Sequence, residues 1–192
     1  MAPLTFLDLP SEIRIQIYRL LLTIPSPSTP RILGSDQTIY TGLILLSRRI
    51  FEEASVVLYG ENTFLAHPSL LAGLPRLRMY LDPIRSSQLI ARIRRFHIRV
   101  RLDNDPNFSA RAARQAFSHM EELTVEVFQA QYGSSDNKVL RLFEDIRGVK
   151  RARVYGSILA FPKYAKWLEH AMMSCEGVRI EDPGVIETGI VQ

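Results

Sequence analysis

Cysteine is almost absent from this chain of 192 residues, in which Cys175 is the only one. A lone thiol forms no disulfide within the chain and cannot build a zinc site on several thiolates, so a reducing compartment is expected. Long apolar runs are also missing: the uncharged stretches at 20–24 and 42–46 fall far short of the roughly 18 residues that a membrane helix needs. Arg14 and Arg19 interrupt the only segment that could act as a secretory signal. These absences predict a soluble intracellular protein, cytoplasmic or nuclear, with no membrane contact.

Side chains in the patterns that carry catalysis or hold a cofactor are scarce as well. The histidines stand at positions 67, 97, 119 and 170. No two of them have the three- or four-residue spacing that places two metal ligands on one helix face. Cys175 lies close to Met172 and Met173, a setting more typical of inert packing than of a nucleophile. Residues 133–136 lack the lysine and glycine frame of a phosphate-binding loop. We therefore predict that the protein is not an enzyme and has no metal site and no cofactor.

Apolar residues, in contrast, make up 46% of the chain, and near its start they recur at helical spacing. Residues 7–22 are predicted to form a helix, because Pro10 suits a first turn and Glu12 lies where the helix dipole favours an anion. One side of this helix carries Ile13, Ile17, Leu20 and Leu21, and the other carries Ile15, Tyr18 and Leu22. A helix with two apolar sides is expected to contact two partners. The prolines and hydroxyl residues of 24–30 then predict a loop.

A second helix is predicted over 42–60, where apolar residues again recur at three- and four-residue steps. Its inward positions would be Leu43, Leu46, Ile50, Ala54 and Val57. Arg48 and Arg49 stand four residues before Glu52 and Glu53, so two ion pairs are expected on the solvent side of the helix.

Three later segments superimpose on one another: 93–100, 120–127 and 149–156, whose starts lie 27 and 29 residues apart. Each has an apolar residue, a gap of two, and then the alternation of a strand. The segments between them, 108–119 and 137–147, carry apolar residues at helical spacing. Strand and helix units of this length resemble leucine-rich repeats, and such crossovers impose parallel strands. Residues 62–66 are predicted to add a strand, and 83–93 and 162–173 to add helices.

Arginine is concentrated in the segment 76–102, where eight arginines face Asp82 as the only acid. This segment therefore carries a charge of +7, which leaves −3 for the rest of a chain whose net charge is +4. A basic stripe is the footprint of phosphate binding, so a nucleic-acid-associated protein is one hypothesis. No aromatic residues interleave these arginines to stack bases, so any nucleic-acid binding is expected to be weak and non-specific.

Strand alternation gives the same arginines a different role. If Phe96, Ile98 and Val100 point inward, the residues between them point outward together. The outward set, a predicted partner-binding sheet face, is Arg95, His97, Arg99 and Arg101 with Arg153 and Tyr155. Superposition of the repeats places Glu122 between Arg95 and Arg151, and Glu126 opposite Arg99. We favour a cross-strand ladder of ion pairs over nucleic-acid binding.

Two blocks of the N-terminal third together resemble an F-box. The first is Leu7-Asp8-Leu9-Pro10-Ser11-Glu12-Ile13 with Ile17-Tyr18 and Leu20-Leu21-Leu22, and the second is 45–54, LLSRRIFEEA. The continuation 57–64, VLYGENTF, is similar to the F-box-like proteins abundant in filamentous fungi. The resemblance implies a helical module over 4–66 that docks on the Skp-type adaptor of a cullin-RING ubiquitin ligase. Adaptor-binding residues would be Leu9, Pro10, Ile13, Ile17 and Leu20.

The expected fold is therefore mixed α/β, with F-box-like helices packed on a small, parallel-stranded, leucine-rich-repeat-like α/β layer. This layer would span 67–177, and 178–192 would be a C-terminal tail. The leading functional hypothesis is an F-box-like interaction module that recruits a protein partner to ubiquitin ligation. The alternatives are a fungal F-box-like scaffold that binds protein partners without any ubiquitin role, and the basic nucleic-acid-associated protein.

Overall fold

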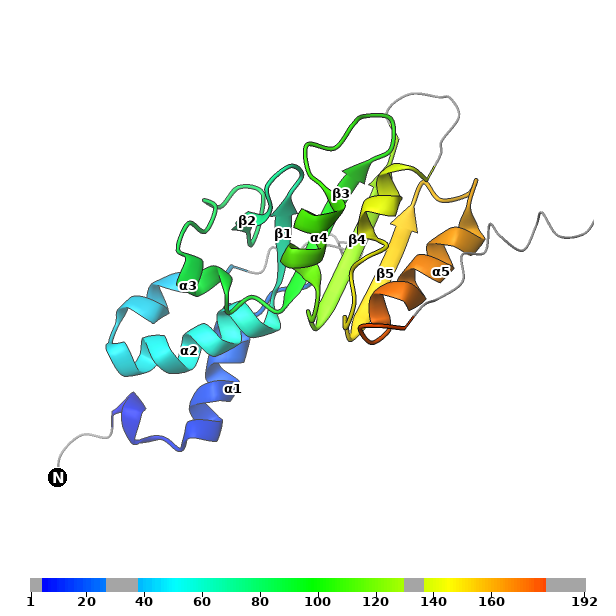
Figure 1. Ribbon diagram of the computed structural model, residues 1–192. Helices are drawn as coiled ribbons and strands as arrows, with labels where there is room; N and C mark the ends of the chain where they lie inside the picture. Colours follow the sequence, from blue (N-terminus) through cyan, green and yellow to red (C-terminus); the bar gives the residue numbers. More distant parts are fainter. Residues whose placement is uncertain (1–4, 27–37, 130–136, 179–192) are drawn as a thin grey trace, which may run out of the picture.

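The computed structural model of the protein describes residues 5–26, 38–129 and 137–178. These residues form a mixed α/β fold around a five-stranded sheet with the order β2-β1-β3-β4-β5 (Figure 1). The strands are β1 (Thr63–His67), β2 (Leu71–Arg76), β3 (Arg95–Arg101), β4 (Glu122–Phe128) and β5 (Arg151–Gly156). Neighbouring strands are parallel, except that β1 and β2 pair antiparallel.

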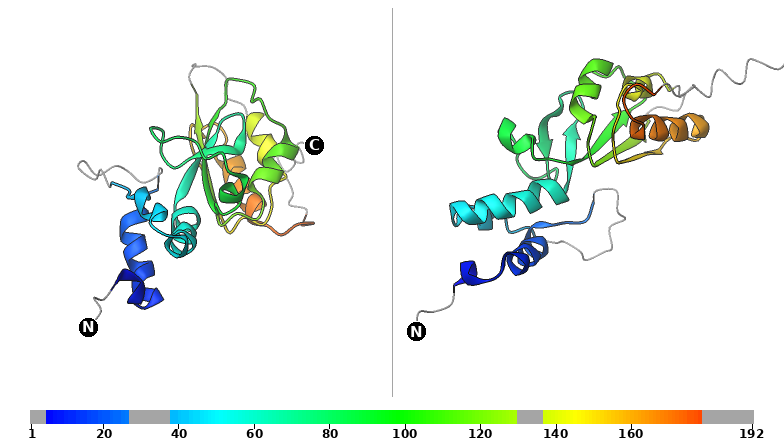
Figure 2. Two further views of the ribbon diagram at one scale, coloured as in Figure 1. Left: turned by 90° about the vertical axis from the view of Figure 1, so that its left-hand side faces the viewer. Right: turned by 60° about the horizontal axis from the view of Figure 1, so that its bottom comes forward.

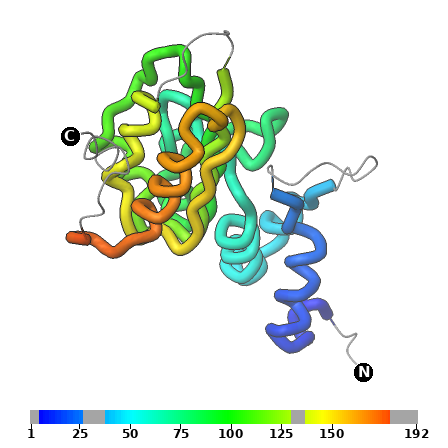
Figure 3. Tube along the Cα trace, turned by 90° about the vertical axis from the view of Figure 1, so that its right-hand side faces the viewer, coloured from blue at the N-terminus to red at the C-terminus, as the bar shows by residue number. Residues whose placement is uncertain are grey.

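Helices surround the sheet on one face and at both ends. They are α1 (Ser11–Leu22), α2 (Arg48–Glu61), α3 (Ser87–Ile90), α4 (Ala110–Phe117) and α5 (Pro162–Met173), with 3-10 turns η1 (Phe6–Asp8), η2 (Thr41–Leu45) and η3 (Val139–Phe143). In Figure 3, α4 and η3 lie on one side of the strands and α1 lies on the other. Figure 2 shows α1 lying against α2, away from β4 and β5.

The sheet confirms the strand register that the repeats predict. Arg95 of β3, Glu122 of β4 and Arg151 of β5 form one row. The next row, which faces the core, is formed by Phe96, Leu123 and Ala152, and the core-facing row after it is formed by Ile98, Val125 and Val154. Strand β1 pairs parallel with β3, so the expected strand at 62–66 is present with its bounds shifted by one residue. The strict alternation of each strand sufficed to set these positions because a slip of one residue would exchange the two faces.

Three connecting segments differ from the prediction. Strand β2 follows β1 in a hairpin that the sequence pattern did not reveal, with Leu71 at a φ of 53°. The segment 83–93 contains only the short helix α3. The segment 137–147 forms the 3-10 turn η3 rather than an α-helix. Its buried residues Leu140, Phe143 and Ile146 recur every three positions, which is the period of a 3-10 helix.

Helix α2 begins six residues later than predicted. Ser47 is its N-cap, and the Ser47 hydroxyl accepts a hydrogen bond from the backbone N–H of Ile50 at 3.2 Å. A serine in this position favours the start of a helix, because its hydroxyl accepts a hydrogen bond from a first-turn amide that has no partner within the helix. Leu46, predicted to point inward, therefore lies outside α2 and is 68% exposed. Gly60 does not end the helix, which continues to Glu61.

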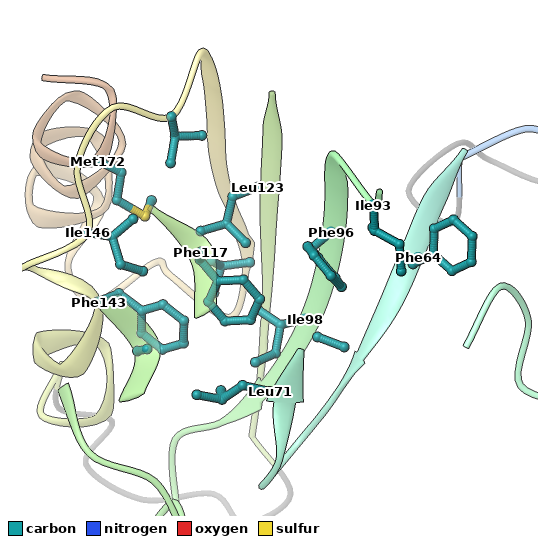
Figure 4. Packing of buried hydrophobic residues seen from close by; sticks show 14 of the residues in the cluster. Phe64, Leu71, Ile93, Phe96, Ile98, Phe117, Leu123, Phe143, Ile146 and Met172 are labelled. Carbon is teal, nitrogen blue, oxygen red and sulfur yellow. The ribbon is translucent and has the colours of Figure 1, made fainter. Parts of the chain in front are cut away.

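One continuous hydrophobic core joins the sheet to the N-terminal helices. Figure 4 shows Phe96 and Ile98 of β3 beside Phe117 of α4, with Phe143 of η3 next to Phe117, and the ring centres of Phe96 and Phe117 are 5.5 Å apart. The same cluster of buried residues includes Tyr18 and Leu22 of α1 and Met172 of α5. The predicted tail, 178–192, lies outside the described residues except for Val178.

Gly156, at the end of β5, tests how tightly the parallel strands are packed. Its φ is +109°, and a Cβ added there would lie 2.1 Å from the Val127 carbonyl oxygen of β4. We expect Gly156→Ala to lower the free energy of unfolding by at least about 2 kcal/mol, because both the φ angle and the clash with backbone are unfavourable.

Urea denaturation of the purified protein measures this effect, and Gly60→Ala provides a matched control. Gly60 lies in α2, and a Cβ added there would have no atom within 4 Å. Alanine has a higher helix propensity than glycine, so Gly60→Ala should stabilise the protein by about 0.5–1 kcal/mol. Equal effects of the two substitutions would contradict the close approach of β4 and β5.

Candidate interaction surfaces

The inward side of helix α1 forms a network of hydrogen bonds with helix α2. Arg14 is 3% exposed, and its guanidinium donates to the Glu53 carboxylate of α2, from Nε to Oε2 at 2.8 Å and from Nη2 to Oε1 at 2.6 Å. The buried hydroxyl of Tyr18 donates to the same Oε2 at 3.1 Å. Arg14 also donates to the backbone carbonyl of Leu9, in the turn that precedes the helix. A two-pronged charged contact of this kind fixes the rotation of α1 against α2.

Asn62 holds the other end of α1. Its side-chain amide donates to the carbonyls of Leu22 at 2.8 Å and Leu58 at 2.9 Å, and its Oδ1 accepts from the backbone N–H of Ile24 at 2.9 Å. This residue is 1% exposed and immediately precedes β1. The C-terminal ends of α1 and α2 are therefore joined at the point where the chain enters the sheet.

The predicted adaptor-binding residues Leu9 and Pro10 lie just before α1, and Ile13, Ile17 and Leu20 lie on the side of α1 opposite Tyr18. We call Leu9, Pro10, Ile13, Ile17 and Leu20 the helical face. Leu9 is 37% exposed, Ile13 42% and Leu20 81%, while Pro10 is exposed and Ile17 is half-buried. Of the two apolar sides of the helix, the one with Tyr18 and Leu22 is packed. On the other side Leu21 packs partly against the core, while Ile13 and Leu20 are exposed. Large apolar side chains held in water in this way are typical of interaction sites.

Sequence reasoning missed the central role of Glu53. The ion pair of Glu53 with Arg49 was expected, and it is present with Nε 3.3 Å from Oε1. The buried partner, Arg14, was not expected, although a signal was available. Arg14 stands four residues before Tyr18 and eight before Leu22, so it shares their helix side. The exposed Leu45, in η2 before α2, was also missed as part of the apolar surface.

The second surface is the outer sheet face, which we define as Arg95, His97, Arg99 and Arg101 of β3 with Arg153 and Tyr155 of β5. Strand alternation places these residues together, as predicted, on the face opposite Phe96. His97 is an exception in its exposure, which is only 2%. Its Nε2 lies 2.9 Å from Oε2 of Glu126, and its Nδ1 has no hydrogen-bond partner among the described residues.

Burial is the main influence on the charge of His97. It lowers the pKa of His97 below the usual value, and the opposing hydrogen bond to Glu126 does not restore it. The ring is therefore neutral near pH 7 and donates from Nε2 to Glu126. The long side chains around it bear the charges of this face, so His97 serves as a structural residue beneath them.

The predicted ion ladder is present only in part. Glu126 pairs with Arg99, with Nε 3.2 Å from Oε1, as expected for residues opposite each other. Glu122 pairs with Arg151 at 3.0 Å. Arg95, expected to share Glu122, instead donates to the carbonyl of Glu61 in α2 at 2.8 Å and lies 3.6 Å from the Glu121 carboxylate. The long side chain of Arg95, at the start of its strand, thus reaches the end of α2.

Tertiary structure disperses the basic segment 76–102. Arg76 donates to the carbonyl of Leu81 at 2.7 Å, outside the outer sheet face. The tertiary structure also places aromatic rings next to arginines of the outer sheet face. The guanidinium of Arg99 lies 5.0 Å from the Phe128 ring centre, and that of Arg153 lies 5.3 Å from the Tyr155 ring centre. The expectation that no aromatic residue accompanies the arginines is wrong, because Tyr80 and Phe96 lie among them in the sequence and the fold adds Phe128 and Tyr155.

The described residues contain no group of three or more histidine, cysteine or carboxylate side chains that could hold a metal ion. None of the helices that they form is long and apolar enough to span a membrane. Comparison with protein-family models, curated proteins and solved structures found no match to this chain. The helical face and the outer sheet face are the two candidate interaction surfaces of the protein.

The Arg14–Glu53 contact predicts an acid-sensitive component of stability. Hydrogen bonds from the Arg14 guanidinium lower the pKa of Glu53 from 4.5 to about 2. Because the folded-state pKa is the lower one, the contact stabilises the protein fully above pH 4.5 and is lost as the pH falls toward 2. The Glu53 side chain is 24% exposed, so solvent screening should limit this component to on the order of 1 kcal/mol.

Urea denaturation across this pH range compares the wild type with Glu53→Gln. The stability difference between them should be largest above pH 4.5 and should shrink toward pH 2. Glu52→Gln is the matched control, because the neighbouring Glu52 is 58% exposed and its only ion pair among the described residues is with the exposed Arg48. A difference between wild type and Glu53→Gln that does not change with pH would contradict the contact.

Proposed function

We propose that this protein is an F-box-like interaction module that binds a Skp-type adaptor through the helical face and recruits a protein partner to ubiquitin ligation. The observation that carries the proposal is the exposure of Leu9, Ile13 and Leu20, at positions where the sequence resembles the opening of an F-box. An apolar helix side that contacts no core can be buried by an apolar groove on another protein.

The rigidity of α1 supports the same function. Bidentate contact between Arg14 and Glu53 sets the rotation of the helix, and Asn62 secures its end. The helical face is therefore already in place before any partner arrives. A surface fixed in advance loses less conformational entropy on binding than a flexible one, which favours affinity.

The geometry is also compatible with a scaffold that uses the helical face for another protein and has no ubiquitin role. The difference between the two lies in the groove that accepts α1, since both need the same exposed side chains. Direct binding to a purified Skp-type adaptor separates them.

Replacement of helical-face residues should weaken adaptor binding without unfolding the protein. We expect Pro10→Ala combined with Ile13→Ala to cost on the order of 1–2 kcal/mol, or roughly ten- to thirty-fold in affinity, if these residues lie at the centre of the interface. Both residues are exposed, so the melting temperature should stay close to that of the wild type. Calorimetric titration with the adaptor measures the affinity, and a thermal melt measures the stability.

Leu159→Ala is the matched control for this pair. Leu159 is an aliphatic residue that is 94% exposed and lies between β5 and α5. Its replacement should leave adaptor affinity unchanged. If the folded wild-type protein fails to bind the adaptor at micromolar concentrations, ubiquitin ligation is refuted and the adaptor-free scaffold remains.

A further inference from the structure

Two exposed arginines of the outer sheet face are oriented by aromatic rings. Arg99 is 58% exposed while its guanidinium lies over Phe128 of β4. Arg153 is exposed while its guanidinium lies over Tyr155. A guanidinium that rests on a ring keeps its N–H groups at the edge, where they can donate to a planar anion. The rings thus orient donors that the sheet presents outward.

Only part of this positive charge is neutralised within the protein. Glu126 pairs with Arg99, and Asp103 receives two hydrogen bonds from Arg101 at 2.8 Å. Arg153 forms no ion pair with any residue in the described part of the chain. The outer sheet face therefore retains a basic character and has at least one guanidinium whose donors are open to a ligand.

Two classes of polyanion could meet such a surface, and the contacts distinguish between them. A single-stranded nucleic acid needs open ring faces on which its bases stack. Here Phe128 and Tyr155 are half-buried, and guanidinium groups already lie over them. Glu122 and Glu126 also lie in the middle strand of the face, where they would repel a continuous phosphate backbone. Separate carboxylate side chains fit this face better than a continuous phosphate backbone, because they need not pass over the glutamates at every step.

Strand spacing suits an extended acidic segment. Arg99 and Arg153 stand on strands separated by β4, so their backbones lie roughly 10 Å apart across the sheet. Side chains on one side of an extended peptide recur about every 7 Å, so alternate carboxylates can reach both arginines. At Arg99 the incoming carboxylate would share the guanidinium with Glu126. Carboxylates accept two parallel hydrogen bonds from a guanidinium, which gives this contact its specificity.

We propose that the outer sheet face binds an extended protein segment rich in aspartate and glutamate, with Arg99 and Arg153 as its carboxylate-binding residues. This inference rests on the proposed function and deepens it by naming the chemistry of the segment that the module recruits. Figure 1 places α1 and β5 toward opposite ends of the molecule, so the recruited segment and the adaptor would occupy separate surfaces.

Fluorescence anisotropy tests the inference with the full-length protein and two labelled peptides of equal length. One peptide alternates glutamate with serine, and the other replaces each glutamate with glutamine. The wild type should bind the acidic peptide and not the neutral one. Arg99→Gln combined with Arg153→Gln should weaken binding about ten-fold, and the corresponding pair of lysine substitutions should restore only part of it.

Arg111→Gln combined with Arg141→Gln is the matched control, because it removes two exposed arginines from α4 and η3 on the other face of the sheet. Acidic-peptide affinity should not change in this control. The inference is overturned if the wild type does not bind the acidic peptide, or if both pairs of substitutions weaken binding equally. It is also overturned if a single-stranded oligonucleotide binds more tightly than the acidic peptide.

Adaptor titration of the same variants keeps the two proposals distinct. The Arg99→Gln and Arg153→Gln pair should bind the adaptor as the wild type does, because neither residue belongs to the helical face. Loss of peptide binding together with normal adaptor binding identifies the outer sheet face. Peptide binding without any adaptor binding refutes the ubiquitin role alone.

Discussion

The contact between Arg14 and Glu53 is the constraint on which the arrangement of the N-terminal helices depends. Removing a guanidinium from water is costly, and a buried charge is tolerated only when its partner and hydrogen bonds are complete. Here the Glu53 carboxylate and the Leu9 carbonyl accept hydrogen bonds from Arg14, and the Tyr18 hydroxyl donates to the same carboxylate. Once Arg14 points inward, Ile13 and Leu20 must point outward, because a helix rotates as a unit. The exposed helical face is thus a consequence of a buried polar one.

The two faces of the sheet likewise separate apolar side chains from charged ones. The inward side chains of β3, β4 and β5 pack into one core, while the outward side chains carry nearly all of the charge. His97 is the buried exception, kept neutral by burial and held by Glu126. Glu126 in turn accepts Arg99, so a single carboxylate ties a buried ring to an exposed arginine. The charged surface is therefore anchored to the core rather than lying loosely over it.

Rigid parts connect the two surfaces. Asn62 joins the ends of α1 and α2 to the start of β1, and Arg95 of β3 donates to the carbonyl of Glu61 at the end of α2. The helical face and the outer sheet face are consequently held in a fixed position relative to each other. The continuous core that runs from Tyr18 to Met172 supplies the stiffness.

Elements with strict periodicity could be predicted from the sequence. Alternation over 95–101 and its two copies set the parallel register, since a slip of one residue would place Ile98 and Val125 in water. Helix α5 was predicted at its observed bounds, because Pro162 suits a first turn and apolar residues follow at helical spacing. Which apolar side of α1 is packed was decided by the tertiary structure, because both sides satisfy the same helical periodicity. Glu53, 39 residues away, binds Arg14 and so turns the Arg14 side of the helix inward. The tertiary structure also brought Phe128 and Tyr155 beside the arginines, since pairing across strands joins residues that no local pattern connects.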